Sequence, residues 1–141
     1  MSGALVIPRG LADEMIEHCL AGRPNEACGL LGSSGDRVVK VFAMTNAEQS
    51  PVRYRLDDRE QLAARNKLDE MGWDLGGVYH SHTHTKAFPS PTDVRDAVED
   101  VPYVIVSLMK ETPVIKAFLI HKESLGDVEG RVEEIPVEVT D

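Results

Sequence analysis

Three of the chain's five histidines, His80, His82 and His84, occupy alternate positions in the stretch 77–84, GVYHSHTH. Alternate side chains leave the same face of an extended strand, so the three imidazoles are expected on one side. Two imidazoles at positions i and i+2 lie close enough to bind one Zn²⁺ at about 2.0–2.1 Å. The same spacing also suits a polar strand end with solvated histidines. The spacing thus does not decide whether a metal site is present or which of the histidines would hold the metal.

Ser90 and Asp93 follow His82 after a seven-residue segment. The run Ser-Pro-Thr-Asp is a favourable helix start, with serine as N-cap, proline at the first helical position and an acid that completes a capping box. That role alone accounts for both residues. A carboxylate brought back to the histidines would also complete a two-histidine, one-aspartate site, leaving a fourth position open as in catalytic zinc sites.

A hydrolytic zinc site also needs a base that takes a proton from water and returns it to the leaving amine. Glu26 is a candidate because it directly precedes the apolar stretch 27–31. Taken alone, it reads equally well as an exposed loop glutamate. It becomes a candidate base only because the histidines and the Ser90–Asp93 pair occur in the same chain.

The composition of the 141-residue chain is that of a globular domain, with 42% hydrophobic and 28% charged residues. A net charge of −9 argues against binding to nucleic acid or to an anionic membrane surface. Cys19 and Cys28 form no CxxC pair and are expected to be reduced and at least partly buried. No signal peptide or membrane-spanning run is evident, so a cytoplasmic protein is expected.

Strands and helices alternate along the chain, and several strands are connected as hairpins. This pattern predicts one α/β domain over residues 1–141, with a mixed, largely antiparallel sheet flanked by helices. The expected strands cover residues 4–7, 27–33, 37–45, 52–56, 73–82, 101–109, 113–121 and one or two segments of 128–139. The expected helices cover residues 11–22, 57–72 and 90–98.

The order Glu26, His80-x-His82, seven residues, Ser90, two residues, Asp93 resembles the JAMM (MPN-plus) metalloprotease motif. The stretches PNEACGLL, TNAEQSPVRYRLD and GVYHSHTHTKAFPSPTDV are similar to the small prokaryotic members of that family, and the similarity extends from about residue 24 to residue 107. Many members have proline after the second histidine, where this chain has threonine.

This resemblance implies a single-domain MPN fold and one zinc ion per chain, held by His80, His82 and Asp93. It implies that Glu26 is the general acid/base and that the Ser90 hydroxyl stabilises the oxyanion. The implied substrate is a ubiquitin-like sulfur-carrier protein, cleaved after its C-terminal Gly-Gly with release of cysteine, as in the Mec-type peptidases. A deconjugating isopeptidase acting on protein lysines and a non-catalytic MPN scaffold are the alternatives.

Three further residues are candidates for substrate contacts. Arg53 or Arg55 could meet the carboxylate of the released residue or an acidic carrier surface, although a solvated charged strand face explains them as well. His84 is expected to line the cleft or the surface. A zinc deaminase is excluded because its H-x-E and P-C-x-x-C signature does not occur.

Overall fold

Eight strands form one sheet in the part of the chain that the computed structural model describes, residues 3–124 and 126–141. The strand order across the sheet is β7-β6-β5-β4-β2-β3-β1-β8. The strands are β1 (Leu5–Pro8), β2 (Cys28–Ser34), β3 (Arg37–Met44), β4 (Asp74–His82), β5 (Tyr103–Ser107), β6 (Val114–His121), β7 (Arg131–Ile135) and β8 (Val137–Thr140).

The sheet is mixed, as predicted. Antiparallel pairing joins β2 to β3 and β4, and β6 to β5 and β7. The pairs β1–β3, β1–β8 and β4–β5 are parallel. β4 therefore lies inside the sheet, with hydrogen-bonded neighbours on both sides, and it provides a rigid base for the side chains at its end.

In the same described part of the chain, three helices complete the fold: α1 (Arg9–Gly22), α2 (Asp58–Met71) and α3 (Pro91–Asp96). The buried side of α1 packs with Leu31 and Tyr79 on one face of the sheet. Ala64 of α2 packs with Leu30 and Val78 on the other face, because neighbouring strand residues point in opposite directions. The side chains of β4 at positions 78, 80 and 82 therefore share the face that α2 covers.

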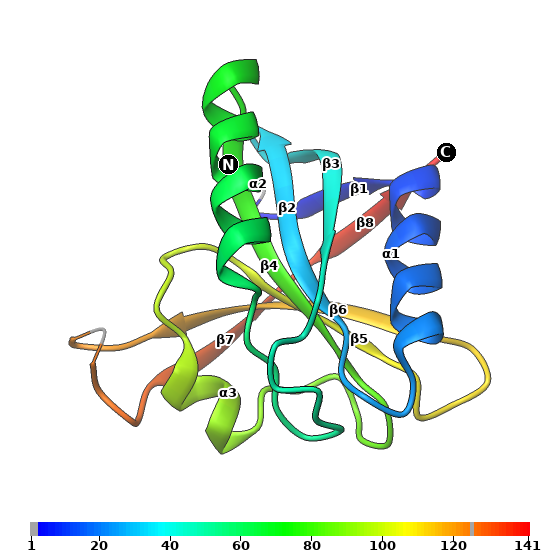
Figure 1. Cartoon of the computed structure of the whole chain (residues 1–141), viewed down its shortest axis with the longest axis vertical. Helices are drawn as coiled ribbons and strands as arrows, with labels where there is room; N and C mark the ends of the chain where they lie inside the picture. The colour runs from blue at the N-terminus through cyan, green and yellow to red at the C-terminus, as the bar shows by residue number, and fades with distance from the viewer. Residues whose placement is uncertain (1–2, 125) are drawn as a thin grey trace.

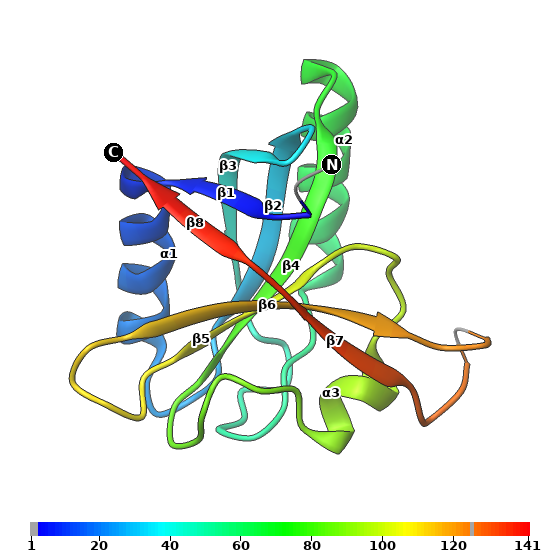
Figure 2. The ribbon, with the colours of Figure 1, turned by 180° about the vertical axis from the view of Figure 1, so that it is seen from behind.

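Two sequence predictions need correction or completion. The alternating segment 52–56 is not a strand: apart from an isolated bridge between Asn46 and Leu56, it is irregular. Its backbone is held by the Asn46 side chain and by the Ala47 N–H, which donates to the Arg55 carbonyl, and not by a neighbouring strand. The C-terminal tail does form two strands, but β8 leaves β7 and pairs with β1 at the opposite edge of the sheet (Figure 2).

The segments that follow β3 and β4 gather with α3 at one end of the molecule, drawn at the bottom of Figure 1. β4 ends there at His82, and α3 begins nearby after residues 83–90. Both cysteines are free and buried, in line with the prediction. Within residues 3–124 and 126–141, no helix combines the length and apolar character needed to cross a membrane.

Candidate metal centre

His80 and His82 lie at the carboxyl end of β4 and are almost fully buried, with 1% and 4% of their surfaces exposed. They are two residues apart in a strand, so both rings lie on the α2 face of the sheet. The hydroxyl of Ser81, between them, faces the other way and accepts a hydrogen bond from the Ala27 N–H at 2.8 Å. The alternation of side chains along β4 thus places the two imidazoles on one face of the sheet and Ser81, which binds the Ala27 backbone, on the other.

Asp93 reaches the histidines from the first turn of α3. Ser90 is the N-cap, Pro91 begins the helix, and the predicted capping box is present. The Asp93 N–H donates to Ser90 Oγ at 3.1 Å, and the Ser90 N–H donates to Asp93 Oδ2 at 2.9 Å. Helix capping therefore fixes the carboxylate in the orientation in which it meets the two imidazoles.

Three potential ligand atoms form a nearly equilateral triangle. His80 Nε2 lies 3.1 Å from His82 Nε2 and 3.2 Å from Asp93 Oδ2, and His82 Nε2 lies 2.9 Å from the same oxygen. Ligands of a tetrahedral zinc ion, each at about 2.0–2.1 Å from the metal, are separated by about 3.3 Å. The side chains present therefore fit a zinc ion with small adjustments, and this cluster could hold a metal.

Burial and mutual contact shift the pKa values of the cluster. Burial lowers the pKa of His80, although contact with Asp93 opposes this. Burial would lower the pKa of His82 too, but hydrogen bonds with Asp93 and the Lys86 carbonyl outweigh it and raise that pKa. Burial would raise the pKa of Asp93, yet hydrogen bonds from both histidines hold it well below its usual range. Asp93 is thus held as an anion and His80 as a neutral imidazole, the protonation states that metal binding requires.

Contacts behind the ligands orient the two rings. His82 Nδ1 lies 2.9 Å from the carbonyl oxygen of Lys86, an arrangement that directs Nε2 toward the cluster. The His80 ring stacks on Tyr54, with ring centroids 4.4 Å apart and an interplanar angle of 20°. Such second contacts fix the orientation of metal-binding imidazoles.

Glu26 is buried beside this cluster, with 5% of its surface exposed. Its Oε1 atom has no hydrogen-bond partner among the described residues. Burial, assisted by the negative charge of Asp93, raises the pKa of Glu26 to about 8. A carboxyl group with a pKa near neutrality can accept and return a proton at the pH of the cell.

The sequence-predicted residues divide into two groups. His80, His82, Asp93, Ser90 and Glu26 converge at one end of the sheet, whereas His84 is exposed outside the cluster and contacts Thr83 Oγ1 at 2.8 Å. The two arginines line a cavity of about 440 Å³ together with Tyr54. Each is also engaged within the chain. Arg53 pairs with Asp96 at 3.1 Å, and Arg55 with Glu48 at 3.3 Å and with Asp58 at 3.8 Å.

Three residues that contact the predicted site residues were not predicted from the sequence: Tyr54, Ser81 and Asn46. Tyr54 alternates with Val52 and Leu56, a pattern that indicates a strand and gives no reason to place the ring at the site. Ser81 was visible only as the residue between two histidines. Asn46 could not be found by spacing, since its partner at the site, Glu26, is 20 positions away in the sequence.

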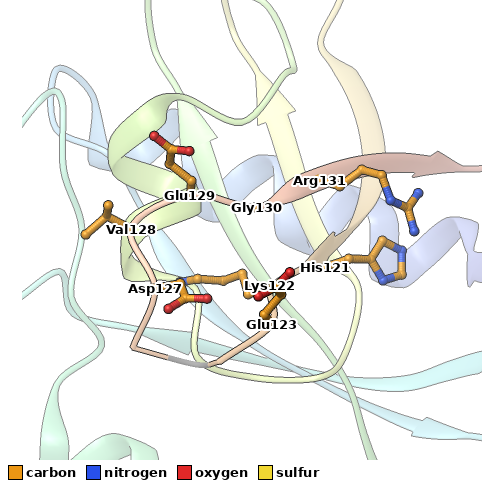
Figure 3. A pocket seen from close by; sticks show the side chains of 8 residues that line it. All are labelled: His121, Lys122, Glu123, Asp127, Val128, Glu129, Gly130 and Arg131. Carbon is orange, nitrogen blue, oxygen red and sulfur yellow. The ribbon is translucent and has the colours of Figure 1, made fainter.

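A separate cavity of about 780 Å³ lies at the β6–β7 connection (Figure 3). Its lining includes His121, Glu129 and Arg131 but none of the predicted site residues. Lys122, at its edge, donates to the carbonyls of Val94, Arg95 and Ala97 at 2.9, 3.0 and 2.9 Å. This lysine therefore holds the end of the helix that carries Asp93.

Comparison with known proteins places this geometry in a family. The chain is 41% identical over 143 residues to the CysO-cysteine peptidase of Mycobacterium tuberculosis, an alignment that covers 97% of this chain and 92% of that protein. It is 37% identical over 117 residues to the probable TtuB-protein conjugate cleaving protease of Thermus thermophilus, covering 82% of this chain and 76% of that protein.

A solved structure has a similar fold, and a family model gives the assignment. The solution structure of a protein from Desulfitobacterium hafniense superimposes with a TM-score of 0.83 at 37% identity, covering 96% of this chain and 92% of that one. The family described as prokaryotic homologs of the JAB domain matches residues 8–121. The resemblance to JAMM proteins seen in the sequence is therefore confirmed, and the chain belongs to the prokaryotic JAB-domain family.

Proposed function

We propose that this chain is a zinc peptidase that hydrolyses the bond after the C-terminal Gly-Gly of a ubiquitin-like sulfur-carrier protein and releases cysteine. The observation that carries the proposal is the convergence of His80 Nε2, His82 Nε2 and Asp93 Oδ2 at tetrahedral spacing beside a buried glutamate. The high identity to a CysO-cysteine peptidase over nearly the whole chain supports the choice of substrate.

His80, His82 and Asp93 are the proposed zinc ligands, with one ion per chain. A bound zinc supplies Lewis acidity, which polarises a carbonyl group and acidifies water. Glu26 takes a proton from the attacking water through Oε1, an atom without a hydrogen-bond partner among the described residues. It then delivers that proton to the leaving nitrogen as the C–N bond breaks.

Ser90 is proposed to donate a hydrogen bond to the oxyanion that forms at the scissile carbonyl. Its role as N-cap is compatible with this task, because Oγ accepts a hydrogen bond from the Asp93 N–H. A hydroxyl group that accepts in this way still has its own hydrogen to donate. One side chain can therefore start the helix and stabilise developing charge.

The carrier protein is the proposed partner, and Arg53, Arg55 and His84 are proposed contacts for it. Arg53 keeps about half of its side chain exposed despite its ion pair with Asp96, so a partner carboxylate can reach it. Arg53→Ala should raise KM for the carrier while zinc content stays unchanged. An unaltered KM would remove Arg53 from the substrate site.

Cleavage of a ubiquitin-like modifier from protein lysines is the second candidate function, because the Thermus relative is named as a conjugate-cleaving protease. A cytoplasmic location is part of the proposal. The free, buried state of both cysteines agrees with a reducing compartment.

The decisive assay offers the zinc-loaded protein two substrates, a carrier ending in Gly-Gly-Cys and the same carrier joined to lysine through an isopeptide bond. We expect faster cleavage of the cysteine adduct. Faster cleavage of the isopeptide would select the second candidate function, and cleavage of neither would refute both.

Zinc content provides a matched test of the metal site. His82→Ala should lose the ion, which distinguishes an enzyme from a non-catalytic scaffold, whereas His84→Ala should retain about one zinc per chain. Glu26→Gln should keep zinc and lose turnover. Retained turnover in that variant would show that another group is the base.

A further inference from the structure

Asn46 has a side chain whose hydrogen-bonding capacity is completely used. Its Nδ2 donates to the Glu26 carbonyl at 2.9 Å and to the Arg53 carbonyl at 3.0 Å. Its Oδ1 accepts from the Glu48 N–H at 2.9 Å and the Arg55 N–H at 3.1 Å. A side-chain amide has two donor hydrogens and two acceptor lone pairs, so all four are satisfied in a residue that is 8% exposed.

These bonds tie the segment 45–57 to the start of β2. Asn46 forms an isolated bridge with Leu56, and the Ala47 N–H donates to the Arg55 carbonyl at 2.8 Å, so the two ends of the segment are joined. From within the segment, the Ser50 carbonyl accepts the Glu26 N–H at 2.9 Å. The peptide groups on both sides of Glu26 are therefore held by one loop.

The backbone has special importance at Glu26 because its side chain lacks a hydrogen bond at Oε1 within the described part of the chain. A carboxylate that must meet water and a leaving nitrogen cannot be fixed by permanent side-chain partners. Its position is set by its own peptide groups, which Asn46 and Ser50 hold. The same loop carries Tyr54, which stacks on His80.

We propose that Asn46 is a positioning residue: its amide donors place Glu26 against the metal cluster and hold the loop that packs Tyr54 against His80. This inference rests on the proposed hydrolytic function, in which Glu26 transfers the proton. It assigns Asn46 a specific task, since misplacing a proton-transfer group by about 1 Å can cost about 100-fold in rate.

Asn46→Asp is the most selective variant, because it preserves shape and both acceptor bonds but removes both donors. We expect kcat to fall by about 100-fold, with KM within about threefold of the wild type and about one zinc retained per chain. A merely structural residue would lower zinc content and folded fraction together and leave the kcat of the folded protein unchanged. Should Asn46→Asp not fold, Asn46→Ser, which keeps one donor, takes its place.

Two controls match the perturbation. Asn66→Asp makes the same chemical change on the exposed surface of α2 and should leave kcat unchanged. Thr45→Val removes the 3.1 Å hydrogen bond from Thr45 Oγ1 to Glu60, at the start of the same loop, without touching the Glu26 backbone. It should also keep full activity.

A measurement that needs no turnover separates this inference from the proposed function. In zinc-free protein, the Glu26 N–H, which donates to the Ser50 carbonyl, should exchange with solvent at least about tenfold faster in Asn46→Ala, because the loop that holds it is loosened. If the wild type cleaves neither substrate, the proposed function fails, while this exchange rate still decides whether Asn46 holds the Glu26 backbone. Folded, zinc-replete variants with wild-type kcat, or an unchanged exchange rate of the Glu26 N–H, would overturn the inference.

Discussion

Glu26→Gln is expected to make the zinc-free protein more stable at alkaline pH, although it removes the proposed catalytic base. The wild-type Glu26 is 5% exposed, its Oε1 has no hydrogen-bond partner in residues 3–124 and 126–141, and it lies near the negative charge of Asp93. Ionising such a group is unfavourable, whereas a glutamine of nearly the same shape never ionises. The variant therefore removes a cost that the folded protein bears only when Glu26 is charged.

The sign and size of the effect follow from the pKa of Glu26, which burial raises from 4.5 to about 8. Between these pH values the folded protein retains a proton that the unfolded chain releases, so the unfolding free energy falls as pH rises through this window. A displacement of this size corresponds to at most about 5 kcal/mol. Local relaxation and partial solvent access reduce that ceiling, and we expect about 2–3 kcal/mol.

Urea unfolding of chelator-treated wild type and variant, at intervals from about pH 5 to pH 8.5, measures the difference directly. The two unfolding free energies should agree near pH 5 and diverge toward pH 8.5, with the variant the more stable. The contributions of His80 and His82 to the pH dependence of the unfolding free energy are present in both proteins, so they cancel to first order when the two free energies are subtracted. Glu17→Gln, an exposed change on α1, should show a constant difference. A Glu26→Gln difference that is equally flat would refute the assigned cause of the pKa shift.

Three other substitutions should affect stability through separate contacts. Ser81→Ala leaves the buried Ala27 N–H without its acceptor and should cost about 2 kcal/mol, seen as a melting temperature about 7 °C lower; an unchanged melting temperature would contradict this. Gly29→Ala places a methyl group against the Tyr79 ring and a strand carbonyl, so it should cost more than about 3 kcal/mol or yield insoluble protein; normal stability in urea would be inconsistent with this packing. Lys122→Met removes a charged donor from three carbonyl groups at the end of α3, so the unfolding free energy should fall by about 1–2 kcal/mol. Zinc binding should also weaken, which competition with a chelator measures. Unchanged zinc affinity would show that α3 keeps its position without the lysine.

The parts of the side-chain arrangement that the sequence could predict are those fixed by local geometry. A spacing of two residues in a strand is enough to bring His80 and His82 together. A serine–proline–x–aspartate run is enough to begin α3 with the carboxylate in its first turn. His84 was expected at the surface or in the cleft because the loop to Ser90 was expected to begin before it, and it lies exposed beyond the end of β4 at His82. Each of these inferences needs only a few neighbouring residues, because the strand and helix repeats act over that range.

Contacts between different segments of the chain could not be predicted from the sequence. The alternation at 52–56 suggested a strand, but Asn46 satisfies the backbone N–H of Arg55 and the carbonyl of Arg53, which therefore need no sheet partner. The path of β8 to the far edge was likewise invisible, since alternation shows that a segment is extended but not which strand it joins. The burial that raises the pKa of Glu26 arises in the same way from segments distant in sequence.

The capping box of α3 has a bearing on how distant relatives are interpreted. One oxygen of Asp93 both accepts the Ser90 N–H and faces the two imidazoles, so selection for a helix start alone is enough to preserve this serine–aspartate pair. A descendant that lost its metal could keep both residues for generations. The two histidines begin no helix, although His82 also contacts the Lys86 carbonyl and His80 stacks on Tyr54, so their replacement is the more direct sign that a homologue has lost its metal.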